Sequence, residues 1–380
     1  MMDKNDRDLL PEGLEDRLPQ ATAAATRITR AIMDVLDSHG FDRVQPPSIE
    51  FERSLASRMA GIETRRMVRF IDPASLRMMA LRSDMTPQVG RLAATRLKSA
   101  ARPLRLAYAG QVVALKGDGL DPTRERLQIG AELIGHDGAA AAGEVVAVAI
   151  EALQAAGASG ISVDFTLPDL IDALAGKDGA QGPWPLTPEQ LEAVRRELDA
   201  KDAGGLVGAG GAAYLPLLHA TGAFEASIAR LEALGLGEVL SGRIAALRQI
   251  AARLPATVRL TLDPTERHGF EYQSWFGFQI FASGVQGAVA RGGSYAILGA
   301  PNEAGEAATG FSLYPDPLIT ALAAGETPRD VVFLPLGHDA QAAARLRAAG
   351  WRTVAALGDC CDAVALGCTH RLDGAEPVRL

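Results

Sequence analysis

The stretch DPTRERLQIGAELIG, residues 121–135, decides how the rest of the sequence is interpreted. As a strand, it would place successive side chains on alternate faces of a sheet. One face would be apolar, and the other would carry Arg124, Arg126, Gln128, Gly130 and Glu132. Charged and amide groups around a glycine indicate either a solvated sheet face or the floor of a polar pocket. Alternation alone favours the solvated face, which is the usual arrangement for such a strand.

The composition is typical of a soluble globular protein. The chain has 380 residues, of which 48% are hydrophobic, and this is enough for a large core. Its apolar runs end well before the ~18 residues that a membrane span needs, and its polar N-terminus lacks a signal-like apolar segment. We therefore expect a cytoplasmic protein with no membrane partner. The net charge of −8 disfavours nucleic acid as a partner, because phosphate contacts need a concentrated basic surface.

The cysteines and the known short motifs point to no cofactor chemistry. All 3 cysteines lie in CCDAVALGCTH, residues 360–370, so no disulfide framework spans the fold. Together with His370 they suggest a metal site, but the spacing fits no C-x-x-C pattern, and small buried residues of a terminal element explain them better. The sequence also contains no P-loop, H-E-x-x-H or G-x-S-x-G motif. We expect neither a metal nor another cofactor.

Hydrophobic periodicity divides the chain into four parts. Residues 1–167 and 256–325 combine hairpin strands with flanking helices, which predicts one α+β core with a mixed or antiparallel sheet. Between them, residues 168–255 are rich in alanine and leucine and predict a helical insertion. The tail, residues 326–380, begins with a strand, helix, strand pattern and predicts a small α/β unit.

Within the core, several elements can be predicted individually. The spacing of apolar residues predicts a helix over 14–39 and two strands within 104–134. Ser83 or Asp84 is expected to cap a following helix. A hairpin is expected to turn near Ser283–Gly284.

Two glycine-containing strands carry polar side chains that would converge if the strands share a sheet: Gln128, Glu132, Arg291 and Tyr295. Asp84 and Thr86, at a strand-to-helix junction, would join them near a helix N-terminus. The carboxylates suit an ammonium group, while the amide and hydroxyl groups suit a polar ring or a carboxylate. Such a cavity would hold a zwitterionic small molecule such as an amino acid.

Five segments, taken in order, resemble the catalytic fold of the class II histidyl-tRNA synthetases over nearly the whole chain. They are QPPSIEF (45–51, motif 1), LRSDMT (81–86), RERLQIGAELIG (124–135, the second half of motif 2), HGFEYQSWFGF (268–278, the histidine-recognition segment) and RGGSYAILG with TGFSL (291–313, motif 3). The resemblance implies a class II aminoacyl-tRNA synthetase-like antiparallel sheet flanked by helices and a homodimer interface at motif 1. It also implies that the C-terminal α/β unit is truncated relative to an anticodon-binding domain.

The sequence departs from the synthetases where ATP chemistry needs fixed positive charge. Adenylate formation develops negative charge on phosphates, which arginines and metal ions stabilise. At three positions where the resemblance implies a catalytic arginine, this chain has Ala114, His268 and Pro317. Since losing one preorganised charge contact costs roughly 10²-fold in rate, we predict that the chain has no catalytic residue and forms no adenylate.

The amino-acid side of the synthetase site is retained. The resemblance implies that six residues bind histidine: Asp84, Thr86, Gln128, Glu132, Tyr272 and Tyr295. Asp84 stands where the family has the acidic residue that meets the ligand amino group. Gln273 stands where the family has the second tyrosine of the recognition segment.

This combination resembles the ATP phosphoribosyltransferase regulatory subunits of histidine biosynthesis. The resemblance implies a non-catalytic chain that assembles with a short catalytic subunit, enables its activity and conveys feedback inhibition by histidine. It also implies homodimers within a hetero-octamer. Two alternatives remain open, namely a catalytically active histidyl-tRNA synthetase and a stand-alone histidine-binding or tRNA-scaffold protein. Ala114 and Pro317 weigh against the active synthetase.

Overall fold

The computed structural model describes residues 9–56, 67–117, 121–176, 182–267, 273–299, 305–323, 329–359 and 361–380. Two of the residues discussed above, His268 and Tyr272, lie outside these ranges. The chain forms two compact units, Met1–Ala323 and Ala324–Leu380. Each unit has its own sheet.

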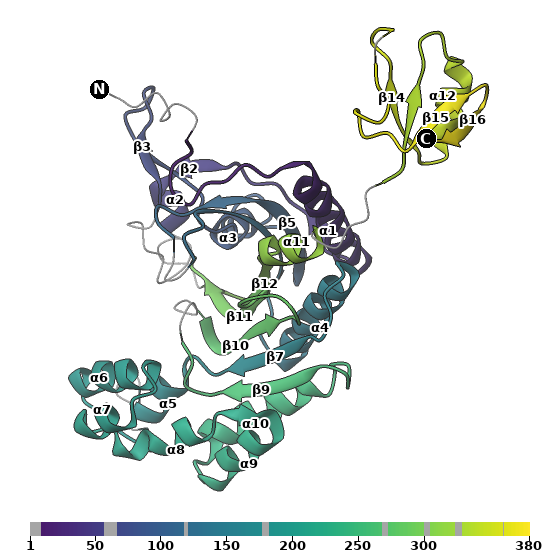
Figure 1. Cartoon of the computed structure of the whole chain (residues 1–380). Coiled ribbons are helices and arrows are strands. Elements are labelled where there is room, and N and C mark those ends of the chain that lie inside the picture. The colour runs from purple at the N-terminus through teal and green to yellow at the C-terminus, as the bar shows by residue number, and fades with distance from the viewer. Residues whose placement is uncertain are drawn as a thin grey trace, which may run out of the picture. The chain divides into compact units, whose positions relative to one another are not determined.

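A 9-stranded sheet with the order β1-β5-β6-β12-β11-β10-β7-β9-β8 forms the centre of the first unit (Figure 1). Its strands are β1 (Asp42–Arg43), β5 (Leu104–Val113), β6 (Glu125–Ile134), β7 (Ser162–Thr166), β8 (Gly222–Ala223), β9 (Arg259–Asp263), β10 (Gln273–Phe281), β11 (Ala290–Ile297) and β12 (Glu306–Leu313). Neighbours are antiparallel except for β1 with β5 and β7 with β9. The predicted mixed α+β sheet and the two strands within 104–134 are confirmed.

Three helices cover one face of this sheet: α1 (Pro19–Ser38), α4 (Ala139–Ala155) and α10 (Glu238–Ala251) (Figure 1). The apolar side of β6, including Leu127 and Ile129, packs into the same core as these helices. Helix α1 begins at Pro19, later than the predicted residue 14, because proline at the first helical position favours a helix start there. The described residues before Pro19 form no helix, and Gly13 and residues 15–18 line a cavity of the first unit.

The opposite face of the sheet carries α3 (Thr86–Ala94), whose Val89 packs against Tyr108 and Tyr295. Met85 is the residue before this helix and gives no side-chain cap. The expected capping by Ser83 or Asp84 is therefore wrong in position. Asp84 instead accepts a hydrogen bond of 3.0 Å from the backbone N–H of Thr86, which fixes its carboxylate at the helix start.

Smaller elements adjoin this face. A 3-stranded sheet has the order β2-β4-β3, with strands β2 (Ile49–Phe51), β3 (Arg69–Ile71) and β4 (Met78–Leu81). The helix α2 (Glu52–Ala56) packs against this small sheet and α3, whereas α11 (Asp316–Ala323) packs against α1. The segment around the two prolines of motif 1 is extended, as expected, because proline cannot donate the hydrogen bonds that a helix interior needs.

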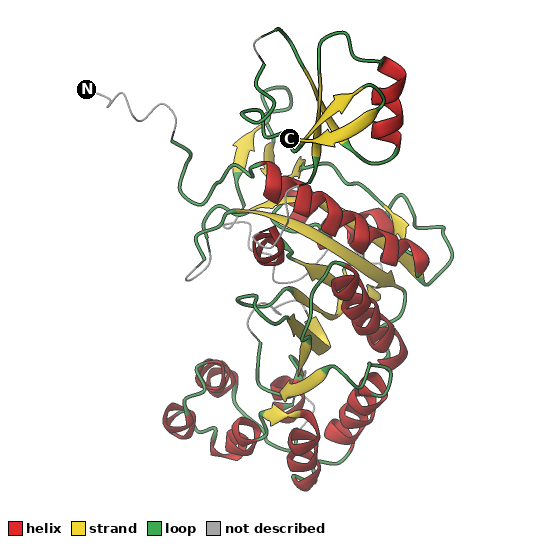
Figure 2. Cartoon of the chain, turned by 45° about the vertical axis from the view of Figure 1, so that its right-hand side comes forward, coloured by secondary structure: helices red, strands yellow, loops and turns green. Residues whose placement is uncertain are grey.

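The predicted insertion folds into short helices gathered at the end of the sheet that carries β9 (Figure 2). Besides α10, they are α5 (Leu170–Ala175), α6 (Pro188–Asp199), α7 (Ala203–Gly208), η3 (Ala212–Tyr214), α8 (Leu215–His219) and α9 (Phe224–Ala233). A capping box starts α6, in which Thr187 and Gln190 exchange hydrogen bonds between side chain and backbone. The insertion is not purely helical, because its short strand β8 pairs with β9 at the edge of the main sheet.

The second unit is a 4-stranded sheet with the order β14-β13-β15-β16. Its elements are β13 (Val331–Leu334), α12 (Ala340–Ala348), β14 (Arg352–Ala355), β15 (His370–Asp373) and β16 (Glu376–Arg379). The predicted strand, helix, strand pattern is present, and the final hairpin is an addition to it. Cys368 is buried and Cys361 is half-buried, while Cys360 lies outside the described residues.

Two further observations concern the described part of the chain as a whole. Within it, no three or more histidine, cysteine, aspartate or glutamate side chains gather in a way that could hold a metal ion. Among the helices that the structure describes, none is both long enough and apolar enough to cross a membrane.

Candidate functional site

A cavity of about 1590 Å³ opens on the face of the main sheet that carries the alternating polar residues. Pockets for small ligands commonly measure about 300–1,000 Å³, so this cavity has more room than one amino acid fills. Its inner part surrounds Glu132, and its outer part lies between the N-terminal segment, the loop before β6 and the start of α11. The two parts differ in chemistry.

Glu132 is the centre of the inner part. Tyr108 Oη donates a hydrogen bond of 2.9 Å to one carboxylate oxygen, and Tyr295 Oη donates one of 2.7 Å to the other. The Tyr108 hydroxyl also lies 3.2 Å from Thr86 Oγ1 and 3.1 Å from Ser312 Oγ. These contacts join β5, β6, β11, β12 and the start of α3 in one polar network.

The solvated sheet face can be excluded. Gln128 has an exposed fraction of 0% and Glu132 of 1%, although both lie on the polar side of the β6 alternation. On a solvated sheet face, such long polar side chains would be exposed to water. The polar side of this strand is therefore covered by other parts of the protein, and Glu132 lies in the wall of the cavity.

Burial strongly perturbs the titration of Glu132. Removal from water raises its pKa from 4.5 to about 8, and the nearby Asp84 carboxylate acts in the same direction. The hydroxyls of Tyr295 and Tyr108 lower the pKa, but by less. At neutral pH and with no ligand, Glu132 is thus mostly protonated. An approaching cation, or a base that takes the proton, would convert it to the carboxylate.

Gln128 positions its neighbours. Its Nε2 donates to Asp84 Oδ1 at 2.7 Å and to Ser312 Oγ at 2.8 Å, and its Oε1 accepts from the backbone N–H of Met85 at 2.8 Å. Both ends of the amide are therefore occupied within the protein. Gln128 ties β6 to the start of α3 and holds Asp84 at the cavity wall.

The space over Gly130 is filled by the side chain of Tyr108 and is not available to a ligand. Tyr108 lies directly opposite Gly130 in the pairing of β5 with β6. A Cβ built on Gly130 would collide with the Tyr108 hydroxyl. The sequence alone did not identify Tyr108 as a site residue. It could be identified only from the register of the β5–β6 hairpin, which places this aromatic residue opposite a glycine.

The five predicted histidine-binding residues that the structure describes form one connected group: Asp84, Thr86, Gln128, Glu132 and Tyr295. Arg291 also lines the cavity, but its side chain is exposed on β11. Tyr272 lies outside the described residues.

The outer part has arginines, but the protein itself engages them. Arg126 forms an ion pair of 2.7 Å with Asp121, and Arg17 forms one with Asp316. Arg124 donates through its guanidinium to backbone carbonyl oxygens, including that of Ala114 at 3.4 Å. Asp316 further accepts a hydrogen bond of 2.9 Å from the backbone N–H of Leu127.

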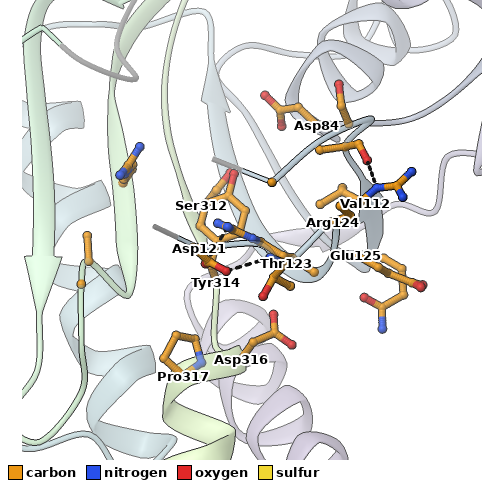
Figure 3. A pocket seen from close by; sticks show the side chains of 18 of the residues that line it. Asp84, Val112, Asp121, Thr123, Arg124, Glu125, Ser312, Tyr314, Asp316 and Pro317 are labelled. Carbon is orange, nitrogen blue, oxygen red and sulfur yellow. Dashed lines mark hydrogen bonds and ion pairs between the residues drawn. The ribbon is translucent and has the colours of Figure 1, made fainter. Parts of the chain in front are cut away.

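Two positions implied to have lost an arginine line this outer part directly. Ala114 and Pro317 both border the cavity, and Pro317 lies beside Asp316 at the start of α11 (Figure 3). Apart from Asp84 and Glu132 of the inner part, five of the described residues that line the cavity carry carboxylates and five carry cationic groups, so the outer part has no surplus of positive charge. A site for a triphosphate needs a surplus of fixed positive charge, so this outer part is unsuited to ATP activation.

Known proteins that are similar to this chain include both histidyl-tRNA synthetases and ATP phosphoribosyltransferase regulatory subunits. A family model for histidyl-tRNA synthetase matches residues 13–318. The ATP phosphoribosyltransferase regulatory subunit of Paramagnetospirillum magneticum is 40% identical over 383 residues, covering 98% of each chain. That of Rhodospirillum centenum is 40% identical over 372 residues, covering 95% of this chain and 94% of its own.

Solved structures share the fold. A protein from Bacillus halodurans described as an ATP phosphoribosyltransferase regulatory subunit/histidyl-tRNA synthetase has a TM-score of 0.76 at 24% identity, covering 95% of this chain and 96% of that chain. Histidyl-tRNA synthetase from Nostoc has a TM-score of 0.74 at 16% identity, covering 97% and 92%. These structures establish the class II synthetase-like fold, and the curated relatives, similar over nearly their full lengths, establish the family. The chain belongs to the family of ATP phosphoribosyltransferase regulatory subunits.

Proposed function

We propose that this chain is the non-catalytic subunit through which histidine controls an ATP phosphoribosyltransferase at the first step of histidine biosynthesis. One observation carries the proposal: a single cavity combines a polar site around Glu132 with an outer part in which Arg17 and Arg126 are paired with carboxylates of the protein. The inner part suits an amino acid, while the outer part lacks the charge that adenylation requires.

The ligand that fits the inner part is a zwitterion with a polar side chain. Asp84, half-buried at the wall, receives the α-ammonium group. Glu132, deeper in the protein, meets the imidazole ring, because a protonated carboxyl group hydrogen-bonds to a ring nitrogen without an uncompensated buried charge. Thr86, Tyr295 and Tyr272 complete the proposed set of contacts.

Control of activity requires more than binding. Histidine shifts an assembly between active and inhibited states only if it binds one state more tightly than the other. We assign this role to the cavity. The partner is a short catalytic subunit in the cytoplasm, and the assembly contains homodimers of this chain within a hetero-octamer. The chain itself contributes no catalytic residue and needs no cofactor.

Reconstitution tests the proposal. The short catalytic subunit is assayed for phosphoribosyl transfer alone and with this chain, and the mixture is titrated with histidine. We expect the chain to raise the activity and histidine to lower it again. A catalytic subunit whose activity does not change when the chain is added would overturn the proposal.

A further inference from the structure

Residues 12–18, which we call the strap, run along the outer part of the cavity before helix α1 begins. Gly13 and residues 15–18 line the cavity directly. The loop before β6 and the start of α11 form the neighbouring walls, and their residues Thr123 and Asp316 line the same pocket (Figure 3). The strap is attached to both of these walls.

The first attachment is at the start of β6. The backbone N–H of Arg124 donates to the Gly13 carbonyl at 2.8 Å, and its guanidinium donates to the Glu12 carbonyl at 3.4 Å. A Cβ on Gly13 would collide with the Pro122 carbonyl. Glycine therefore lets the strap lie directly against this wall.

The second attachment is an ion pair at the other end of the strap. Arg17 pairs with Asp316 of α11, and the two side chains are 30% and 23% exposed. Asp316 also accepts a hydrogen bond of 2.9 Å from the backbone N–H of Leu127, which fixes its carboxylate. The Arg17 carbonyl accepts one of 2.8 Å from the Thr22 hydroxyl in the first turn of α1. Both partners of the ion pair are thus held in place by other parts of the fold.

Between these attachments, the strap contributes little to the core. None of residues 9–18, all of which the structure describes, is buried, and Leu18 is 70% exposed. The wall opposite is different, because Leu318 and Ile319 of α11 are each only 2% exposed. Segments with few buried apolar contacts open locally at a small cost in free energy. The strap, rather than α11, is therefore the part that can move.

We propose that the strap is a gate of the cavity and that the ion pair of Arg17 with Asp316 is its latch. The gate opens when the strap leaves both walls and pivots at Leu18, where extended backbone meets α1. The proposal rests on the proposed binding of histidine in this cavity and adds how the ligand enters and leaves.

A gate and a ligand-holding residue differ in their kinetics. The strap borders the outer part of the cavity, so it closes over an empty and an occupied inner part alike. A larger open fraction then raises the association and dissociation rates by the same factor and leaves the dissociation constant unchanged. Losing a contact to the ligand instead acts mainly on the dissociation rate.

Two substitutions break the latch from opposite sides. Arg17→Gln removes its positive charge, and Asp316→Asn removes its negative charge but keeps an oxygen for the N–H of Leu127. Because a hydrogen bond to a charged group typically shifts an equilibrium by about tenfold or more, we expect each variant to raise both histidine rates about tenfold. The double variant should match the single variants, since all three lack the same ion pair.

Exchange NMR spectroscopy of the full chain with isotope-labelled L-histidine measures both rates. Hydrogen–deuterium exchange of the chain without ligand provides a second readout. The Arg124 amide, which donates to Gly13, should exchange about tenfold faster in Arg17→Gln than in the wild type, because the strap leaves it more often.

Arg105 offers a matched control. Its ion pair of 2.9 Å with Glu144 has side chains that are 32% and 29% exposed, close to the values for the latch. The described lining of the cavity includes neither residue. Arg105→Gln should leave both histidine rates and the exchange of the Arg124 amide within about twofold of the wild type.

The outcomes separate the gate from the function on which it rests. If the wild type binds no histidine, both fail. If it binds histidine but both rates in Arg17→Gln and Asp316→Asn stay within about twofold of the wild type, the proposed function stands and the gate is overturned. A rise in the dissociation rate alone would also overturn the gate, because that is the behaviour of a residue that holds the ligand. Equal exchange of the Arg124 amide in the wild type and in Arg17→Gln overturns the gate whatever the chain binds.

Discussion

Glu132 determines how histidine binding should depend on pH. It is surrounded by the hydroxyls of Tyr108 and Tyr295 and by the Asp84 carboxylate, and its pKa is raised to about 8. The free protein therefore carries a proton here at pH 7. A free imidazole loses its proton above about pH 6.5. If the ring meets Glu132, one proton is shared in the complex, and almost none is released or taken up between about pH 7 and 7.5, where most free imidazole is already neutral.

Calorimetry in two buffers with different ionisation enthalpies counts the protons exchanged on binding. We expect a count near zero at pH 7 and an affinity that is flat across this range. If the α-ammonium group met Glu132 instead, the carboxyl group would have to ionise on binding. About one proton would then be released, and affinity would rise nearly tenfold per pH unit below the raised pKa. That result would contradict the proposed orientation of the ligand.

Substitutions of Gln128 and Asp84 should differ in their effects on the free energy of unfolding and on histidine affinity. Gln128→Ala removes three buried hydrogen bonds, so it should lower the free energy of unfolding by about 1–3 kcal/mol and also weaken histidine binding. Asp84→Asn keeps an acceptor for Gln128 and for the Thr86 backbone. It should leave unfolding nearly unchanged and weaken binding at least tenfold, because the charge that meets the ammonium group is lost.

Urea unfolding and calorimetry of the two variants provide the measurement. Equal losses of stability in both would show that Asp84 is structural. Unchanged histidine affinity in Asp84→Asn would place the ammonium group elsewhere.

At the residue scale, the sequence could predict part of this site. Alternation in β6 and the motif resemblance identified Gln128 and Glu132, since both signals are local. Tyr108 and Ser312 could not be predicted, because they reach Glu132 and Gln128 only through the pairing of strands distant in sequence. The absence of an arginine at Ala114 was visible in the sequence, but the pairing of Arg17 and Arg126 with carboxylates was not.

At the scale of elements, the outer part of the cavity explains why ATP should not be activated. The N-terminal segment crosses the start of β6, where the backbone N–H of Arg124 donates to the Gly13 carbonyl at 2.8 Å. Gly13 has φ of +79°, and a Cβ there would collide with the Pro122 carbonyl, so this crossing needs glycine. The segment continues to Arg17, which pairs with Asp316.

We therefore predict that the purified chain shows no histidine-dependent exchange of pyrophosphate with ATP above background. The reason is the loss of preorganised positive charge, which typically costs ~10²-fold per contact. A catalytically competent histidyl-tRNA synthetase assayed in parallel serves as the control. Robust exchange by this chain would sink the non-catalytic assignment and favour the active synthetase.

The boundaries of helices and strands were predictable where they depend on the hydrophobic periodicity and turn residues of a short stretch of sequence. The hairpin of β10 and β11 follows directly from periodicity and turn residues. The start of α1 was predicted too early, because the helical spacing of apolar residues extends to residues before Pro19, where the helix begins. The strand β8 has only two residues, too few to show a period, so the contribution of the insertion to the main sheet could not be predicted.

At the scale of the whole molecule, the order of strands in the sheet required more than local patterns. The convergence of polar residues from β6 and β11 required that these strands share a sheet, and they do so with β12 between them. Gly310 of that intervening strand leaves the space in which the Glu132 carboxyl group lies. The fold class followed from the order of five short motifs, whereas the depth and charge of the cavity depend on side chains brought together from distant parts of the chain.

The central claim is that this cavity gives histidine control over a separate catalytic subunit, and one measurement tests it most directly. Phosphoribosyl transfer by the short catalytic subunit is measured with the wild-type chain and with Glu132→Gln, and each complex is titrated with histidine and normalised to its own activity without histidine. Glu132→Gln keeps the shape of the protonated side chain but cannot share its proton with the ring. We predict that the wild-type complex is inhibited by histidine and that the variant complex needs at least tenfold more histidine for half-inhibition. Identical inhibition curves for the two complexes would contradict the account.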